Sequence, residues 1–242
     1  MRIDVLTLFP EMFNGFLNNS IIKRTIDKDL VTIYIHDFRT FSQNKHHKVD
    51  DTPYGGGAGM LLSLQPIVDC LRSIPGYKEA YKILTSARAQ VYTQQTALKI
   101  AKYEHIIIIC GHYEGIDERI LDYVDIEISI GDYIMTGGEL ASLVLIDTII
   151  RLLPKAIKSH SLEDESFSKD LLEYAQYTKP VIYEGKVVPE VLVSGNHEEI
   201  RKFRLYSSLK KTYLNRPDLI KEGNLSSEAK EYLAKIKKEE SF

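Results

Sequence analysis

The segment between residues 105 and 154 constrains the fold more than any other part of the sequence. It opens with a short apolar run at residues 106–110, whose β-branched side chains predict a strand buried on both faces. Gly111 and Gly115 follow directly and bracket three polar residues. A flexible backbone and polar side chains therefore meet at the end of a buried strand, where open α/β sheets usually bind ligands.

A second glycine-rich turn, SIGDYIMTGGEL, leads into an apolar helix. Gly131, Gly137 and Gly138 let the backbone approach a ligand or another part of the chain more closely than side chains would allow. Residues 139–153 are apolar on almost every side, begin with a carboxylate that suits a helix N-terminus, and stop at Pro154, so we expect a buried helix. So much apolar surface is also typical of a homodimer face.

Strands and helices alternate in the first part of the chain. We expect strands at residues 3–9, 31–36 and 82–86, and helices at residues 63–73 and 94–102. Together with the strand at residues 106–110, this alternation predicts an α/β fold with a mostly parallel sheet and helices on both faces.

Composition narrows the function. The 242 residues allow one large domain or a medium and a small one, and 44% hydrophobic residues suffice for a core. The net charge of -3 means that any nucleic acid must be held by local basic patches. Cys70 and Cys110 lie in apolar runs without a CxxC pair, which predicts neither a disulfide framework nor a zinc site and fits the cytoplasm. No apolar run reaches the roughly 20 residues of a bilayer span, so we expect no membrane partner.

The polar stretch FSQNKHHKVDDTPYGGGAGM is a third glycine-rich loop. It lacks the Lys-Ser/Thr pair of a P-loop, and no GxGxxG follows any expected strand, so a dinucleotide or nucleoside triphosphate is disfavoured. His46 and His47, with Asp50 and Asp51, match no metal-ligand spacing.

Four motifs resemble those of one family. GHYEGIDER, SIGDYIMTGGEL, VDDTPYGGGAGM and SGNHEEIRKFRLYSSLKKT are similar to segments of the bacterial tRNA (guanine-N1)-methyltransferases, in the SpoU-TrmD superfamily. The resemblance covers nearly the whole chain. It implies S-adenosylmethionine bound in a trefoil knot of the N-terminal domain, a homodimer, and methylation of the guanosine at tRNA position 37, just 3′ of the anticodon.

The resemblance also implies which residues hold the cofactor, mainly through backbone groups of three loops. They are Leu84, Thr85, Ser86, Gly111, Tyr113, Glu114, Gly115, Ser129, Ile130, Gly131, Asp132, Tyr133, Ile134, Met135, Gly137 and Gly138. The sequence departs from the family at Ala87 and Arg88, where proline and glutamine are common, at His112, often arginine, and at Ala141, often proline. The glycines are intact, so we expect binding to survive. The family further implies magnesium, for which Glu114 is a candidate ligand.

The chemistry requires a base and a cation. Guanine N1 is a poor nucleophile until its proton leaves, so a carboxylate near N1 and a positive charge near O6 are needed. By resemblance, Arg151 supplies the charge. The family's catalytic aspartate aligns with Glu165, immediately before Ser166, and Asp164 is the alternative base.

The resemblance and a change of composition after Pro154 suggest three regions. They are a cofactor-binding domain at residues 1–158, a flexible linker carrying the catalytic acid at residues 159–174, and a small, mainly helical tRNA-binding domain at residues 175–242. In the last region, Asn196 can cap a helix whose basic residues are assigned to tRNA: Arg201, Lys202, Arg204, Lys210 and Lys211. We expect residues 227–239 to form an amphipathic helix that packs against the rest of this region and does not bind RNA.

Three alternatives remain open. The first is a catalytically impaired RNA-binding homologue, which would keep the basic helix. The glutamate at position 165 in place of the family's aspartate favours this alternative. A Rossmann-type small-molecule enzyme fits the alternating pattern but lacks GxGxxG. A related knotted methyltransferase could act on another RNA position.

Overall fold

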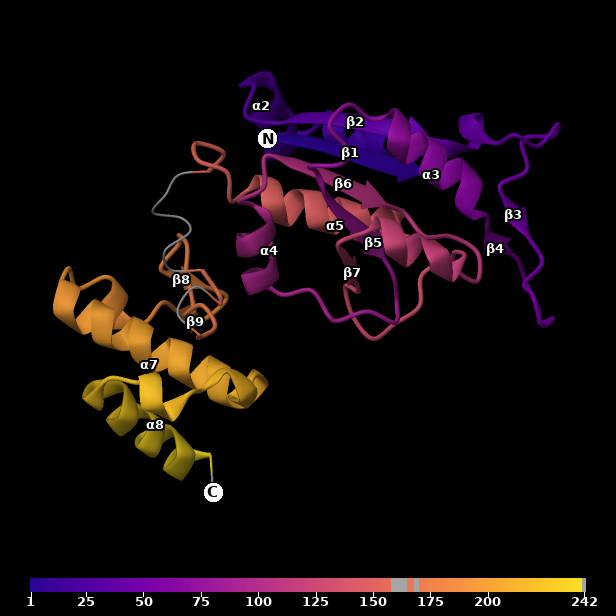
Figure 1. Cartoon of the computed structure of the whole chain (residues 1–242). Coiled ribbons are helices and arrows are strands. Elements are labelled where there is room, and N and C mark those ends of the chain that lie inside the picture. Colours follow the sequence, from indigo (N-terminus) through magenta and orange to yellow (C-terminus); the bar gives the residue numbers. More distant parts are fainter. Residues whose placement is uncertain (158–164, 168–169, 241–242) are drawn as a thin grey trace. The chain divides into compact units, whose positions relative to one another are not determined.

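The computed structural model describes residues 1–157, 165–167 and 170–240 (Figure 1). The chain divides into two compact units, Met1–Ile157 and Lys158–Phe242. Each unit has its own hydrophobic core. No helix among the described residues is long and apolar enough to cross a membrane.

The first unit is built on a five-stranded sheet in which every pairing is parallel. Its strands, in spatial order, are β2 (Thr32–Asp37), β1 (Arg2–Thr7), β6 (His105–Ile109), β5 (Tyr81–Thr85) and β7 (Ile126–Ile128). The mostly parallel sheet expected from the alternation of strands and helices is confirmed.

Strand β6 lies in the middle of this sheet and is buried on both faces. Ile106 and Ile108 pack into the core on one face, whereas Ile107 and Ile109 pack into the core on the other, and all four side chains are fully buried. A strand covered on both sides has no need for polar alternation, which explains its continuous apolar sequence.

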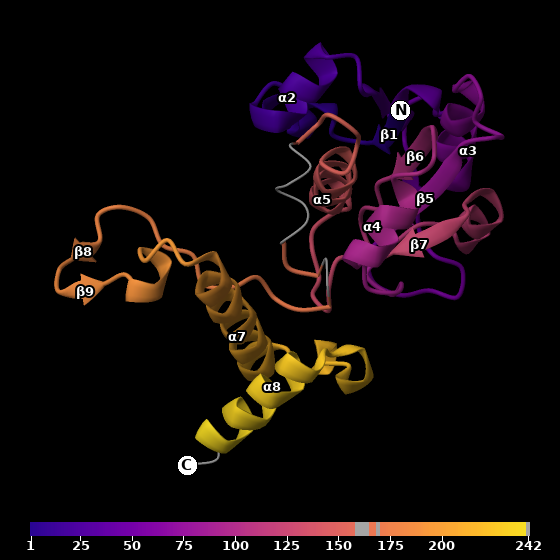
Figure 2. The same cartoon turned by 90° about the vertical axis from the view of Figure 1, so that its left-hand side faces the viewer.

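Helices cover both faces of the sheet (Figures 1 and 2). On one face, α2 (Ser20–Asp27), α4 (Gln94–Ile100) and α5 (Glu139–Ile150) contribute apolar side chains to the core. On the other face the core is closed by α3 (Leu64–Ser73). The short helix α1 (Asn14–Leu17) precedes α2. Short 3-10 helices occupy Pro10–Phe13, Phe38–Phe41, Glu118–Tyr123, Glu190–Leu192, Pro217–Leu219 and Glu222–Asn224.

Three features of this unit differ from the expectation. Helix α5 ends at Ile150, and it is buried on one face only, because the side chains of Leu140 and Val144 are 52% and 41% exposed. The prediction of a fully buried helix was therefore wrong. Strand β7 was not expected, nor was the small antiparallel pair of β3 (Asp50–Asp51) and β4 (Leu61–Leu62) around the third glycine-rich loop.

A buried carboxylate ties three strands together. Asp4 in β1 is fully buried and accepts hydrogen bonds from Arg2 Nε at 2.7 Å and Arg2 Nη2 at 3.0 Å. His36 Nε2 from β2 and His105 Nε2 from β6 lie 2.7 and 2.8 Å from its two oxygens. Burial raises the pKa of the Asp4 carboxyl, but the hydrogen bonds from His36, Arg2 and His105 outweigh it and hold the pKa at about 2.

The second unit is mainly helical, as expected. It contains α7 (His197–Asn215) and α8 (Ser227–Glu239), preceded by a hairpin of β8 (Ile182–Tyr183) and β9 (Lys186–Val187). The side chain of Asn196 accepts a hydrogen bond from Glu199 N at 3.3 Å and so caps α7.

Candidate functional site

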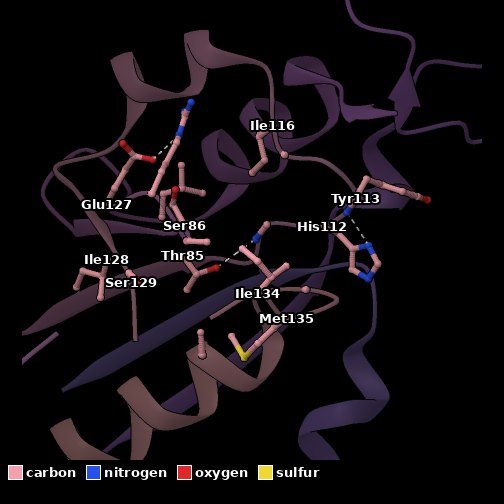
Figure 3. Close-up of a pocket in the computed structure, with 18 of the residues that line it drawn as sticks. Thr85, Ser86, His112, Tyr113, Ile116, Glu127, Ile128, Ser129, Ile134 and Met135 are labelled. Carbon is pink, nitrogen blue, oxygen red and sulfur yellow. Dashed lines mark hydrogen bonds and ion pairs between the residues drawn. The ribbon is translucent and has the colours of Figure 1, made fainter. Parts of the chain in front are cut away.

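Three loops converge at the carboxyl edge of the sheet, where β5, β6 and β7 end. Between them lies a cavity of about 470 Å³ (Figure 3), a volume within the usual range for small-molecule sites. In parallel sheets this edge is where ligands bind, because the loops that leave it can be varied without disturbing the core.

The structure brings together the residues assigned to the cofactor. All sixteen except Asp132 line the cavity. The sequence did not assign several others that line it, among them Leu61, Arg88, Ile116, Glu118 and Glu127. Glu118 lies in the GHYEGIDER motif and could have been included, but nothing local marks Glu127.

Gly138 allows the loop after β7, residues 129–138, to pass close to the ends of β5 and β6. Its amide donates a hydrogen bond to Gly111 O at 2.7 Å. A Cβ atom at this position would lie 2.0 Å from Thr85 Oγ1 and 2.8 Å from Gly111 N. Since real Cβ contacts do not approach so closely, only glycine fits where the loops meet.

Two buried polar side chains hold this junction. Thr85 Oγ1 donates to Ile109 O at 3.2 Å and accepts from Gly111 N at 3.2 Å, which joins the ends of β5 and β6. Glu139, at the N-terminus of α5, is 2% exposed and accepts a hydrogen bond from Thr7 Oγ1 at 2.9 Å. The helix start is thereby fixed to β1, and a carboxylate is favourable at this end of a helix.

The loop after β6 has an unusual backbone. Tyr113 has a φ of 57°, in the left-handed region, and its amide donates to His112 Nδ1 at 2.9 Å. The His112 ring lies 5.0 Å from the ring of Phe9 and 5.1 Å from that of Tyr113, as Figure 3 illustrates for the two labelled side chains. The His112 side chain therefore makes aromatic contacts beside the cavity.

The third glycine-rich loop is joined to the loop after β6. Leu62 N donates to Gly115 O at 2.9 Å, and Asp117 N donates to Leu62 O at 3.0 Å. A Cβ atom on Gly59 would lie 2.2 Å from Glu114 Cγ, so the side chain of Glu114 covers this glycine. The VDDTPYGGGAGM segment thus ends against the wall of the cavity.

Charges around the cavity are mostly negative. Glu114, Glu118 and Glu127 contribute carboxylates, and Arg88 contributes a guanidinium. The Arg88 side chain pairs with Glu118, and its Nε lies 3.8 Å from Glu127 Oε1. Such a lining favours a ligand that carries positive charge.

The described residues do not form a magnesium site of their own. None of them belongs to a group of three or more histidine, cysteine, aspartate or glutamate side chains that could hold a metal ion. Glu114 is exposed and offers one carboxylate. Its role as a magnesium ligand stays a prediction.

The described residues assigned to catalysis are not among those that line the cavity. Arg151 directly follows α5 and is half-buried, whereas Gly138 directly precedes α5. Glu165 is half-buried in the second unit. The alternative base, Asp164, lies outside the described residues.

The segment that follows Glu165 is attached to α7. Ser166 Oγ accepts a hydrogen bond from Glu173 N at 3.0 Å, and Leu172 N donates to Thr212 Oγ1 of α7 at 2.9 Å. This described part of the expected linker is therefore anchored to the second unit.

Most of the basic residues assigned to tRNA have partners within the second unit. Arg201 pairs with Glu198 and Glu228, Lys202 with Glu199, and Lys210 with Glu240. Arg204 lies 4.7 Å from the centre of the Tyr174 ring. Lys211 is exposed and has no carboxylate partner among the described residues. Exposed pairs of this kind contribute little to stability, so phosphate groups can replace the carboxylates.

Comparison with known proteins identifies the family. The family model described as tRNA (Guanine-1)-methyltransferase TrmD matches residues 1–222. A tRNA (guanine-N(1)-)-methyltransferase of Malacoplasma penetrans is 54% identical over 219 residues, which cover 90% of this chain and 96% of the relative. A relative with the same name from Clostridium tetani is 49% identical, and the match covers 96% of this chain and 98% of the relative. Another from Clostridium novyi is 50% identical, and the match covers 99% of each chain. The chain belongs to the tRNA (guanine-1)-methyltransferase family.

Proposed function

We propose that this protein transfers a methyl group from S-adenosylmethionine to N1 of the guanosine at tRNA position 37. Family membership over residues 1–222 supports the reaction. The observation that carries the proposal is the cavity at the ends of β5, β6 and β7, which is lined by the three loops that the family's motifs encode. A Rossmann-type small-molecule enzyme is disfavoured, because the family match extends over both units.

The cavity fits the methyl donor in size and in charge. S-adenosylmethionine supplies an electrophilic methyl group from a positively charged sulfur. The surplus of carboxylates around the cavity favours that charge, and Thr85, Gly111 and Gly138 are among the residues that line it. Contacts through backbone groups also explain how the site tolerates Ala87 and His112.

We assign the proton transfer to a carboxylate at the start of the second unit. Glu165 is the base, with Asp164 as the alternative, and it removes the proton from guanine N1. Arg151 stabilises the negative charge that develops on O6 as the proton leaves. These roles rest on resemblance together with the chemistry of the ring.

Two features of the architecture belong to the same proposal. The loops around Gly111 and Gly138, which a hydrogen bond between these two residues joins, form a trefoil knot, and this assignment is based on membership of the family. Residues 1–158 bind the cofactor, residues 159–174 carry the base, and residues 175–242 bind tRNA through α7, with Lys211 and Arg204 contacting phosphates.

A homodimer is the third part of the proposal. Three apolar side chains near the cavity are exposed. On α5, Leu140 is 52% exposed and Val144 is 41% exposed, and in the loop after β7 Ile134 is 86% exposed. Leu140 and Val144 lie four residues apart on α5, and Ile134 lines the cavity. Exposed apolar residues of this kind are typical of an interface, and in a cyclic dimer the same surface serves both chains.

Methyl transfer to tRNA tests the function directly. Purified protein is incubated with radiolabelled S-adenosylmethionine and two transcripts of one tRNA, with guanosine or adenosine at position 37, and the product is digested and mapped. We expect N1-methylguanosine from the first transcript only.

The other outcomes would each overturn a defined part of the proposal. Label at another position in both transcripts would indicate a related methyltransferase with a different target. Tight binding of both transcripts without any transfer would indicate an RNA-binding protein without catalysis.

A further inference from the structure

Arg88 is the one guanidinium among the described residues that line the cavity. It belongs to the loop after β5. Its Nη2 pairs with Glu118 Oε2 of the 3-10 turn at Glu118–Tyr123, and its Nε lies 3.8 Å from Glu127 Oε1 in β7. The Arg88 side chain therefore links the loop after β5 to two other elements, the 3-10 helix that follows β6 and strand β7.

The two carboxylates differ in their surroundings. The side chain of Glu118 is 65% exposed, so water can solvate it if Arg88 is removed. Glu127 is 23% exposed, and its Oε1 is shielded from solvent and accepts no hydrogen bond among the described residues. A shielded carboxylate oxygen without a hydrogen bond is costly, and Arg88 is the cation nearest to it.

We infer that Arg88 is a positioning residue that holds the wall of the methyl-donor cavity closed by pairing with Glu118 and by compensating the shielded charge of Glu127. The inference rests on the proposed function only for the identity of the ligand. Arg88 does not itself contact the methyl donor. It keeps the loop after β5 against β7, so that backbone groups from residue 84 onward are already in place when the ligand arrives.

The arrangement predicts a specific pattern of energetic coupling. Arg88→Gln leaves Glu127 shielded and uncompensated, so it should weaken binding of S-adenosylmethionine by about threefold to tenfold. Glu118→Gln should weaken it less, because an exposed pair contributes little. Adding Glu127→Gln to Arg88→Gln should restore most of the affinity, because removing both partners is cheaper than leaving one charge alone.

Isothermal titration calorimetry with S-adenosylmethionine on the full-length protein measures these affinities, at low and high salt. Arg119→Gln is the matched control, because Arg119 forms a similar exposed pair with Asp117 on the same turn but does not line the cavity. We expect the control to bind like the wild type at either salt concentration.

Three results would overturn the inference. One is unchanged affinity in Arg88→Gln. Another is a loss in Arg88→Gln that Glu127→Gln does not relieve, which would mean that Arg88 contacts the ligand directly. The third is an equal loss in Arg119→Gln, which would mean a general effect of charge. Failure of the wild type to bind S-adenosylmethionine would instead contradict the proposed function.

Discussion

Gly138 and Arg151 lie at opposite ends of α5, separated by the helix's 12 residues. A helix of that length spans about 18 Å, which exceeds the reach of an arginine side chain. Arg151 therefore cannot serve the cavity that Gly138 helps to form in the same chain. If both residues act in one reaction, the arginine must come from a second copy.

This separation predicts complementation between inactive variants. A protein with Gly138→Ala keeps Arg151, and a protein with Arg151→Ala keeps its cavity. Co-expressed or mixed after mild dissociation, the two should recover about a quarter of wild-type methyl transfer, since about half of the dimers are mixed and each has one complete site. Mixing Gly138→Ala with the double variant Gly138→Ala/Arg151→Ala is the control, and it should stay inactive because neither chain has an intact cavity. Recovery in the control, or none in the test mixture, would contradict shared sites.

Gly138→Ala should also act within one chain. The Cβ atom of the new alanine would lie 2.0 Å from the buried Thr85 Oγ1, so the loop after β7 must move away from β5 and β6. We expect a loss of about 1–3 kcal/mol in the free energy of unfolding and loss of S-adenosylmethionine binding. Urea denaturation and calorimetry measure the two effects.

Gly15→Ala is the matched control, because a Cβ atom added at Gly15 would meet no other atom within 4 Å. It should leave binding unchanged and alter stability by less than about 1 kcal/mol. Normal binding by Gly138→Ala would show that the junction tolerates a methyl group.

The identity of the base is testable at two adjacent positions. Glu165→Gln should lower single-turnover methyl transfer by a factor of about 10² to 10⁴ without changing S-adenosylmethionine affinity, because only proton removal is lost. Asp164→Asn should cost much less. The reverse order would make Asp164 the base, and two active variants would mean that another group removes the proton.

Asp4 should make stability depend on acid pH. Its pKa in the folded protein is about 2, below the ordinary value of 3.8, so its contribution is fully present above about pH 4 and is lost as pH falls toward 2. The contribution at neutral pH is about 2 kcal/mol. Asp4→Asn should therefore be much less stable than the wild type at pH 7, and the difference should shrink between pH 4 and pH 2 in urea denaturation.

Asp27→Asn provides the comparison for this measurement. Asp27 forms an exposed pair with Lys23, 2.8 Å away, and its removal should cost less than about 1 kcal/mol at either pH. A constant difference between Asp4→Asn and the wild type across the acid range would show that the aspartate acts through packing and not through its charge.

Local patterns predicted the central elements because burial and chain geometry determine them residue by residue. The run at residues 106–110 predicted β6, and Ser227–Glu239 has the predicted bounds of α8. Strand β7 was missed because it has only three residues, one of which is Glu127. Its strand character comes from pairing with β5, a contact between segments about 40 residues apart that no local pattern encodes.

The candidate site shows the same division. Glycines such as Gly138 could be assigned from motifs, because the close approach of two loops permits no other residue. Arg88 could not be assigned, since its importance lies in its distance to Glu127, a residue on another strand. The expectation that α5 is buried all round failed at Leu140 and Val144, because an apolar sequence does not tell whether another part of the same chain or a second chain covers it.

The hydrogen bonds between β4 and the loop after β6 make the third glycine-rich loop part of the cavity's cooperative unit. Leu62 N and Asp117 N cannot exchange with solvent unless this short bridge opens, and opening it also releases Gly115 from its place in the wall. We therefore expect the two segments to unfold locally together. A methyl donor that slows opening of one segment should also slow opening of the other, although β4 lies more than 50 residues earlier in the chain.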